Sequence, residues 1–422
     1  MAGRFQVPRG THDLLGGEML RVQKVLQTGR EIFRRYGYRE WQTPIFEEAA
    51  VFNRSLGETS DVVSKEMYLF EDRGGEKLTL RPEGTAPVCR ALVTNGLAQS
   101  LPQKVFYQGP MFRYERPQKG RYRQFHQIGA ELFGAESPLR DAETIAMGRD
   151  FLQALGLGEA VRLELNTLGD MESRAAWREA LITYFSGHED SLSEDSRRRL
   201  AKNPLRILDS KDAGDRALLA DAPAFDSYLN DGSRRFWDEL RESLAAFGVE
   251  FHENPRIVRG MDYYSHTAFE FTTDQLGAQG TVLAGGRYEG LVEEMGGPPV
   301  AAIGWAAGIE RLASLIGPQE EESGGIAVLP LGEENQLKAA ALACELRAAG
   351  WQVALETRGS MKKRMDRVVK SGATHALFLG DDDVARGVVQ LRSLSDRQQR
   401  EVNRADLLTT LAEQTGLSSS PA

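Results

Sequence analysis

The hydrophobic positions near the start of the chain follow two different periods. From Met19 to Tyr36 they recur every three or four residues, which predicts a helix that ends at Gly37. The next run, YREWQTPIFEE, is strand-like but contains Pro44. Because proline cannot donate to a β-ladder, this residue is expected at a sheet edge or a bend.

Residues 66–93 predict a hairpin followed by a helix. The hairpin turns at Gly74 and Gly75, and the helix is expected to begin near Thr85, which is a candidate cap. Glu83 lies just ahead of the helix start, where an acidic residue usually stabilises the helix dipole. Taken alone, the segment RPEGT is therefore weak evidence for ligand binding.

The stretch from Val105 to Glu131 alternates apolar and polar residues on both sides of a turn rich in basic residues, which predicts a β-hairpin. The cations near its tip are Arg113, Arg116, Lys119, Arg121 and Arg123. Charged turns are most often solvated. Arg113, however, lies on the strand before the turn, where a guanidinium needs an anionic partner, and this position indicates bound phosphate or carboxylate.

Residues 171–245 are charged and helix-prone and lie between strand-like segments, which predicts a helical insertion. The basic run 197–199 within it is better explained as a solvated helix face than as a binding site. The strand pattern returns in residues 257–308, which contain the sequence GGRYEG. That sequence is no dinucleotide fingerprint, and the chain has no P-loop sequence, so any bound ATP must be held by arginines.

The last quarter of the chain has a different pattern. Residues 318–325 are acids, serine and glycine and are expected to form a linker. Beyond it, short apolar strands alternate with helices, which predicts an α/β domain over residues 326–422 with a largely parallel sheet. Within it, residues 358–370 hold six cations and one acid, and this local patch is the best candidate there for contacting a phosphate backbone.

The net charge of −9 and the ordinary hydrophobic content are those of a globular protein, so nucleic-acid contacts must come from local patches. Cys89 and Cys344 lie far apart and the histidines form no zinc pattern, so no metal held by the protein alone is expected. No apolar run approaches the length of a membrane helix, and the N-terminus lacks the apolar region of a signal peptide. These features predict a cytoplasmic protein.

Taken together, the segments resemble the class II aminoacyl-tRNA synthetases, and specifically the histidyl-tRNA synthetase family of bacteria. YREWQTPIFEE is similar to the first class motif, FRYERPQKGRYRQFHQIGAE with Arg113 to the second, and GWAAGIERL with Arg311 to the third. Histidine is indicated by VRGMDYY, which matches the family's VRGLDYY apart from Met261, and by AGGRYEGL, which matches AGGRYDGL apart from Glu289.

The resemblance implies a fold and an assembly. It implies an α+β catalytic domain over residues 1–317, built on a mixed, mainly antiparallel sheet flanked by helices, with the helical insertion 171–245 inside it. A linker at 318–325 and an α/β anticodon-binding domain at 326–422 would follow. The first motif, with Pro44, would form the interface of a homodimer.

The resemblance also implies a two-step reaction: L-histidine and ATP give histidyl-adenylate and pyrophosphate, and histidine then passes to the 3′ end of its tRNA. Two anions must be brought together in the first step, so fixed guanidinium groups and Mg²⁺ bound with the ATP phosphates would neutralise and orient them. Arg113 and Arg259 are assigned this catalytic role. No general base is needed, because the attacking carboxylate is already ionised.

The family pattern assigns three sets of residues. Histidine would be bound by Glu83, Gly84, Thr85, Arg113, Gln127, Glu131, Arg259, Tyr263 and Tyr264. ATP would be bound by Arg113, Glu115, Arg121, Phe125 and Arg311. The tRNA acceptor end would meet Arg116, Lys119 and Arg123. Arg121 is assigned to ATP only by resemblance and could equally belong to the tRNA set.

Two other functions share the class motifs. A catalytically inactive, synthetase-like regulatory subunit of histidine biosynthesis would have lost Arg259 or Arg311 and the tRNA-binding end, whereas this chain keeps all three. A synthetase for glycine, proline or threonine would lack the pair of blocks VRGMDYY and AGGRYEGL.

Overall fold

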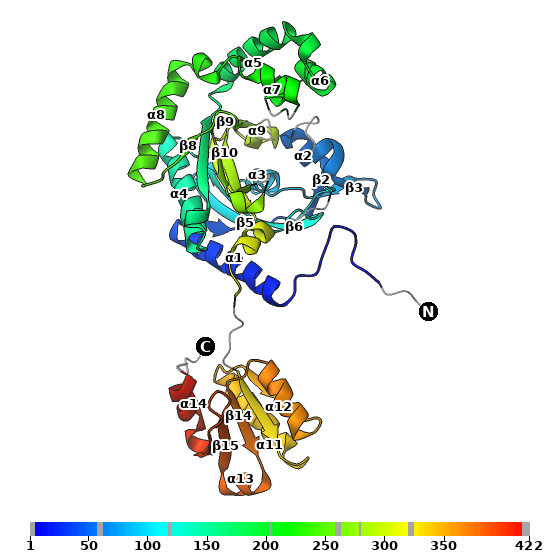
Figure 1. Ribbon diagram of the computed structural model, residues 1–422, viewed down its shortest axis with the longest axis vertical. Coiled ribbons are helices and arrows are strands. Elements are labelled where there is room, and N and C mark those ends of the chain that lie inside the picture. The colour runs from blue at the N-terminus through cyan, green and yellow to red at the C-terminus, as the bar shows by residue number, and fades with distance from the viewer. Residues whose placement is uncertain are drawn as a thin grey trace. The chain divides into compact units, whose positions relative to one another are not determined.

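The computed structural model describes residues 5–56, 62–116, 120–202, 204–208, 210, 212–257, 263–277, 280–319 and 325–415. The chain divides into two compact units, residues 1–318 and 319–422, each with its own hydrophobic core (Figure 1). Among the described residues, no helix is both long and apolar enough to cross a bilayer.

The first unit is built on an eight-stranded sheet. Only the outermost pairs, β1 with β5 and β7 with β8, are parallel, so the predicted mixed, mainly antiparallel sheet is confirmed. In spatial order the strands are β1 (Arg39–Glu40), β5 (Gln103–Phe112), β6 (Gln124–Phe133), β11 (Ala302–Gly308), β10 (Thr281–Tyr288), β9 (Tyr264–Thr272), β7 (Arg162–Thr167) and β8 (His252–Glu253).

One face of this sheet is covered by helices. The core between them contains Phe33, Phe151 and Trp305, whose rings stack. The helices are α1 (Gly16–Arg35), α4 (Pro138–Ala154), α8 (Asp231–Ala246) and α10 (Ile309–Leu315). The predicted first helix is confirmed, since α1 ends just before Gly37, which has a φ of 77°.

The opposite face of the sheet carries a smaller, partly open layer. It holds α3 (Thr85–Thr94) and α9 (Leu291–Glu294), which pack on Tyr107 and Met111 of β5. Beside them lies α2 (Ala49–Leu56), which contacts α3. Because this layer does not cover the whole sheet face, part of that face is left to form a cavity.

A second, three-stranded sheet lies beside the large one. Its order is β2 (Phe46–Glu48), β4 (Lys77–Leu80) and β3 (Tyr68–Glu71), and both pairings are antiparallel. The predicted hairpin turning at Gly74 and Gly75 is thus confirmed as β3 and β4. Pro44 lies where the chain bends from β1 in the large sheet to β2 in the small one.

The helices that follow β7 form a separate small core. Trp177, Phe185 and Phe225 belong to it, together with Leu181, Leu192, Ile207 and Leu229. Its helices are α5 (Met171–Ser186), α6 (Glu194–Lys202) and α7 (Ala213–Leu219). The next helix, α8, sends Leu240 and Leu244 into the main core instead. The part with its own core therefore ends near Leu229, and α8 packs on α4 in the main core of the first unit.

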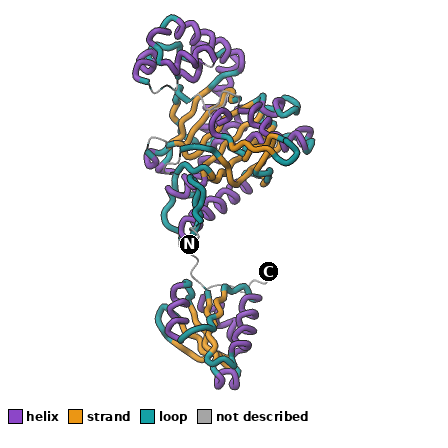
Figure 2. Tube along the Cα trace, turned by 90° about the vertical axis from the view of Figure 1, so that its right-hand side faces the viewer, coloured by secondary structure: helices purple, strands orange, loops and turns teal. Residues whose placement is uncertain are grey.

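The second unit is a five-stranded sheet with helices on both faces (Figure 2). Its spatial order is β13 (Val353–Leu355), β12 (Ile326–Pro330), β14 (His375–Leu379), β15 (Val388–Ser393) and β16 (Gln399–Asn403). The helices are α11 (Gln336–Ala348), α12 (Met361–Lys370), α13 (Asp381–Arg386) and α14 (Leu407–Thr415). The α/β class is confirmed, but β14–β15 and β15–β16 are antiparallel, so the prediction of a largely parallel sheet was wrong.

Candidate active site

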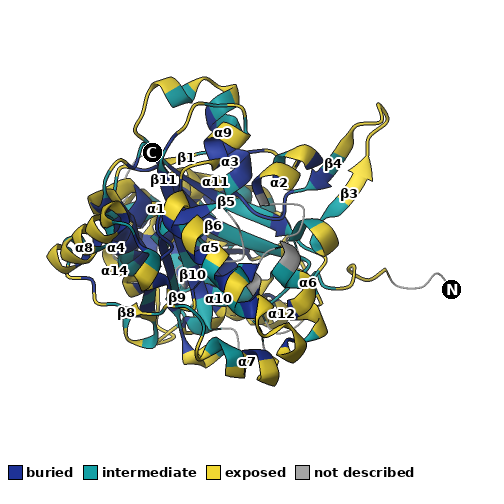
Figure 3. Cartoon of the chain, turned by 90° about the horizontal axis from the view of Figure 1, so that it is seen from above, coloured by how far each residue is buried: buried dark blue, intermediate teal, exposed yellow. Residues whose placement is uncertain are grey.

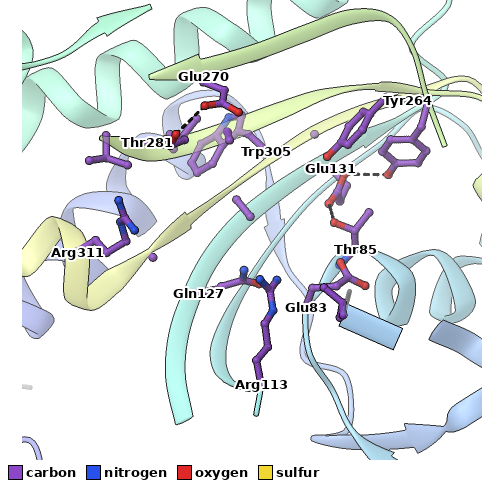
Figure 4. A pocket seen from close by; sticks show the side chains of 18 of the residues that line it. Glu83, Thr85, Arg113, Gln127, Glu131, Tyr264, Glu270, Thr281, Trp305 and Arg311 are labelled. Atoms are coloured by element: carbon purple, nitrogen blue, oxygen red, sulfur yellow. Dashed lines mark hydrogen bonds between the residues drawn. The ribbon is translucent and has the colours of Figure 1, made fainter. Parts of the chain in front are cut away.

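A cavity of about 450 Å³ lies on the face of the large sheet that α1 and α4 leave uncovered. Strands β6, β9, β10 and β11 and the start of α3 provide its walls (Figure 4). The predicted site residues that line it are Glu83, Thr85, Arg113, Arg121, Gln127, Glu131, Tyr263, Tyr264 and Arg311.

The two-residue period of β6 explains why polar side chains enter this cavity. Ile128 and Ala130 are fully buried on the helix-covered face, so their neighbours Gln127 and Glu131 point to the opposite side. On β11, Gly304 pairs directly with Glu131. A Cβ at Gly304 would lie 1.8 Å from Oε2 of Glu131, so the absence of a side chain there makes room for the carboxylate.

Glu131 is held from two sides. It is 1% exposed, Oε1 accepts a hydrogen bond from the Thr85 hydroxyl at 2.7 Å, and Oε2 accepts one from the Tyr288 hydroxyl at 2.8 Å. Burial raises the pKa of this carboxyl to about 8, although both hydroxyl donors favour its ionised form. A buried carboxylate at a cavity wall is suited to a ligand that brings an N–H or a positive charge.

Glu83 takes the capping role that the sequence suggested for Thr85. Its carboxylate accepts hydrogen bonds from the backbone N–H groups of Thr85 at 2.6 Å and Ala86 at 2.9 Å. The prediction that Thr85 caps α3 was wrong, because Thr85 is already the first helical residue and its hydroxyl turns to Glu131. Burial raises the pKa of Glu83.

Gly84 does not line the cavity. A Cβ at this position would lie 2.1 Å from the Tyr107 ring, so Gly84 allows α3 to approach β5 closely. Its contribution is therefore to the placement of Glu83 and Thr85, the residues on either side.

Three guanidinium groups define the other part of the cavity. Arg113 donates from Nε to the Pro82 carbonyl at 2.9 Å, and Arg121 pairs with Glu115 at 2.9 Å. Arg311 lies in the first turn of α10, and burial, followed by the nearby charge of Arg121, lowers its pKa. Gathered positive charge of this kind is suited to a polyanion.

Two residues predicted to bind ATP, Glu115 and Phe125, contact the arginines of this cluster from outside the cavity. Glu115 lies between Arg121 and Arg113, with its second oxygen 3.8 Å from Arg113. The ring of Phe125 lies below Arg113, 5.4 Å from the guanidinium carbon, and packs in the apolar layer with α3 and α9. Neither residue lines the cavity itself.

The tip residues are not equivalent. Arg116 is exposed. The guanidinium carbon of Arg123 instead lies 3.8 Å from the centre of the Tyr114 ring, and its Nε donates to the Glu115 carbonyl at 3.3 Å. Lys119 and Arg259 lie outside the described residues.

The sequence analysis missed further lining residues. Glu270 on β9 accepts a hydrogen bond from the Thr281 hydroxyl at 2.6 Å, and both lie in the part of the cavity that holds Arg311 (Figure 4). An acidic residue between Phe269 and Phe271 in an apolar strand was a usable signal, since an unpaired buried charge is costly. Tyr288 lies in the block AGGRYEGL, but nothing in the sequence connects it to Glu131.

Within the described ranges, no group of three or more histidine, cysteine or acidic side chains is arranged to hold a metal ion.

Comparisons with known proteins cover almost the whole chain. The family model described as histidyl-tRNA synthetase matches residues 10–312, and the model described as anticodon binding domain matches residues 325–414. A histidine–tRNA ligase of Gluconobacter oxydans (strain 621H) is 70% identical over 97% of this chain and 98% of its own length.

Solved structures agree with this fold. The crystal structure of apo histidyl-tRNA synthetase from S. aureus has a TM-score of 0.83 at 32% identity and covers 97% of this chain and 100% of that one. A Bacillus halodurans structure described as an ATP phosphoribosyltransferase regulatory subunit/histidyl-tRNA synthetase has a TM-score of 0.65 at 21% identity, over 90% of this chain and 99% of that one. The second likeness shows the fold alone.

Proposed function

The chain belongs to the histidyl-tRNA synthetase family, and from this membership we infer that its sheet-lined cavity joins histidine to ATP. The chain is an aminoacyl-tRNA ligase: it makes histidyl-adenylate and pyrophosphate and then transfers histidine to the 3′ end of its tRNA. The regulatory-subunit alternative is less supported, because the relatives at high identity are ligases and the anticodon-binding domain is present.

One observation carries the assignment of substrates to the cavity. A single cavity has the buried carboxylate of Glu131 in one part and the guanidinium group of Arg311 in another, with Arg113 between them (Figure 4). Arg121 also lines the cavity, and its charge acts on Arg311. An imidazole needs an acceptor, and a triphosphate needs fixed positive charge. The two substrates would therefore lie with their reacting ends near Arg113.

In the histidine part, Glu131, Tyr264 and Tyr263 would read the imidazole ring. Glu83, Thr85 and Gln127 would hold the α-ammonium group. Support for the latter comes from Gln127, whose Oε1 is buried and has no hydrogen-bond partner in the described part of the chain. An orphaned acceptor in a cavity wall fits a ligand that supplies a donor.

In the ATP part, Arg113 would contact both the α-phosphate and the histidine carboxylate, and Arg121 and Arg311 the other phosphates. By resemblance the adenine would lie between Arg311 and Phe125, with Glu115 beside it, and Arg113, which now covers the Phe125 ring, would have to move to open that contact. Glu270 and Thr281 would bind the ribose, since a carboxylate and a hydroxyl pair well with its two hydroxyl groups. Mg²⁺ would enter with the ATP phosphates.

The residues of the chain promote the reaction by placing charge. The histidine carboxylate attacks the α-phosphorus and pyrophosphate leaves, so negative charge gathers between the two substrates in the transition state. Arg113, and by resemblance Arg259, would neutralise that charge. Because Arg113 is fixed by its hydrogen bond to Pro82, little reorganisation is needed as the reaction proceeds.

The tRNA would meet both units. Arg116, Lys119 and Arg123 would contact the acceptor end. In the second unit, Arg358, Lys362, Lys363 and Lys370 are exposed around α12 and would contact the anticodon arm. Arg364 is not available for this contact, because it is buried and donates to the Pro330 carbonyl at 2.8 Å.

A homodimer is supported by the small sheet. The pairing of β2, β4 and β3 aligns Phe46, Leu80 and Tyr68 in one row and Glu48, Leu78 and Phe70 in the next, so that one face is apolar except for Glu48 at its edge. Phe46 is 50% and Phe70 42% exposed, and Figure 3 shows β3 in the exposed colour. An open apolar sheet face next to the Pro44 bend would be covered by a second copy of the chain. We place the enzyme in the cytoplasm.

The test is histidine-dependent exchange of pyrophosphate into ATP, without tRNA and with Mg²⁺. Wild-type protein should catalyse it. Glu131→Ala should raise KM for histidine far more than KM for ATP, whereas Arg113→Ala should mainly lower kcat. If both variants changed the two KM values alike, the division of the cavity between the substrates would be wrong.

A further inference from the structure

We propose that Tyr288 is a positioning residue for histidine recognition: its hydroxyl, oriented by the Cys89 thiol, holds Glu131 as an acceptor for an imidazole N–H. The proposal rests on the function proposed above, in which Glu131 contacts the imidazole. It adds Tyr288 on β10, which lines the cavity beside Glu131, and Cys89 on α3 to the recognition of the amino acid.

The three groups form a buried line of hydrogen bonds. Cys89 is 0% and Tyr288 1% exposed. The Cys89 sulfur lies 3.8 Å from the Tyr288 oxygen, which lies 2.8 Å from Oε2 of Glu131. An ionised carboxylate only accepts, so Tyr288 must give it its single proton, and the tyrosine oxygen is then left to accept from the thiol. When Glu131 is ionised, the direction of every bond in the line is thereby fixed.

Glu131 is restrained on three sides by different elements. Tyr288 on β10 fixes Oε2, Thr85 on α3 fixes Oε1, and the backbone at Gly304 on β11 closes the third side. A rotation of the carboxylate would break at least one of the two hydroxyl contacts. Its plane, and with it the direction from which an N–H can approach, is therefore set before the ligand arrives.

Counting donors gives the chemical consequence. Thr85 and Tyr288 each supply one proton, and the bound imidazole N–H supplies a third. Only the ionised carboxylate can accept all three, because a protonated carboxyl must itself donate. Without the Tyr288 hydroxyl the ionised form loses one of its two protein donors, so the empty site should retain its proton to higher pH.

The remaining contacts of Tyr288 come from its ring. The ring meets that of Tyr263 edge to face, with centroids 5.6 Å apart, and packs with Cys89 and Leu291. Tyr288→Phe keeps this packing and removes only the hydroxyl. The substitution therefore separates the hydrogen bond from the apolar contacts.

The matched control is Tyr38→Phe. Tyr38 is also buried, at 5% exposure, and its hydroxyl lies 3.5 Å from that of Thr144 within the helix-covered core, on the other face of the sheet. The Tyr38→Phe substitution therefore removes a buried, hydrogen-bonded tyrosine hydroxyl that does not contact Glu131. Thermal unfolding of both variants shows whether either one loses the fold.

The experiment measures pyrophosphate exchange as a function of histidine, ATP and pH. Tyr288→Phe should raise KM for histidine about tenfold or more and leave KM for ATP within about twofold. The pH midpoint of kcat/KM for histidine should shift upward, which a merely structural defect would not produce. Tyr38→Phe should match wild type, and Cys89→Ala should show a smaller shift in the same direction.

Two failures can be told apart. If wild-type protein lacks histidine-dependent exchange, the proposed function is wrong. If wild type is active but folded Tyr288→Phe keeps the wild-type KM for histidine and the same pH midpoint, the role of Tyr288 is wrong. Should Tyr288→Phe fail to fold, Cys89→Ala decides, and an unchanged pH midpoint in that variant overturns the proposal.

Discussion

Gly304→Ala tests whether recognition depends on the position of the Glu131 carboxylate. The new Cβ would lie 1.8 Å from Oε2 of Glu131 and 2.5 Å from the Ala130 carbonyl oxygen. Neither separation is tolerable, so β11 must move by roughly 0.5 Å from the Ala130 carbonyl of β6, and the carboxylate must also retreat by roughly 1 Å or more. That movement breaks its hydrogen bonds to Thr85 and Tyr288, which are 2.7 and 2.8 Å long.

A charge-assisted hydrogen bond to the ligand contributes about 2 kcal/mol. Losing it corresponds to a rise of roughly 30-fold in KM for histidine. The polar groups of the ATP part come from Glu270 on β9, Thr281 on β10 and Arg311 on α10, none of which contacts Gly304, so KM for ATP should stay within about twofold. Pyrophosphate exchange with each substrate varied in turn gives both constants.

The control for this substitution is Gly290→Ala. Gly290 precedes α9 with a φ of −93°, and a Cβ there meets nothing within 4 Å. It should be indistinguishable from wild type in exchange and in thermal unfolding. A folded Gly304→Ala enzyme with wild-type KM for histidine would refute the reasoning.

Since burial raises the pKa of Glu131 to about 8 and the ionised form accepts the imidazole N–H, KM for histidine should fall as pH rises from about 7 to about 9 and then level off, and a flat profile would contradict this. A chain ending at Pro318 keeps the complete core of the first unit, so it should retain exchange but lose tRNA charging; equal loss of both would count against the anticodon assignment. Phe46→Asp places a charge on the open apolar sheet face and should give a monomer in analytical ultracentrifugation, whereas an unchanged dimer would exclude that interface.

Sequence patterns predicted those helices and strands that are determined by residues close together in the chain. The helix α1 and the hairpin β3–β4 follow from periodicity and from turn residues. The start of α3 was also predicted, but its cap was not, because the Thr85 hydroxyl is drawn to Glu131, a residue on a distant strand. The contact between Tyr288 and Glu131 could not be predicted either, because these residues are far apart in the sequence.

The prediction of a largely parallel second sheet was wrong for a similar physical reason. The strand β16 (Gln399–Asn403) is polar and mostly exposed, so it shows no alternation, and the antiparallel half of the second sheet went unseen. Helix α8 has the same charged composition as the insertion before it, yet Leu240 and Leu244 pack in the main core. Composition does not show which core a helix joins.

The most direct test of the central claim is pyrophosphate exchange by the full-length protein with each of the twenty amino acids in turn, without tRNA. The account predicts exchange with histidine and rates lower by several orders of magnitude with the others, because only histidine offers the buried Glu131 an imidazole N–H. Equal exchange with several amino acids, or none with histidine, would contradict it.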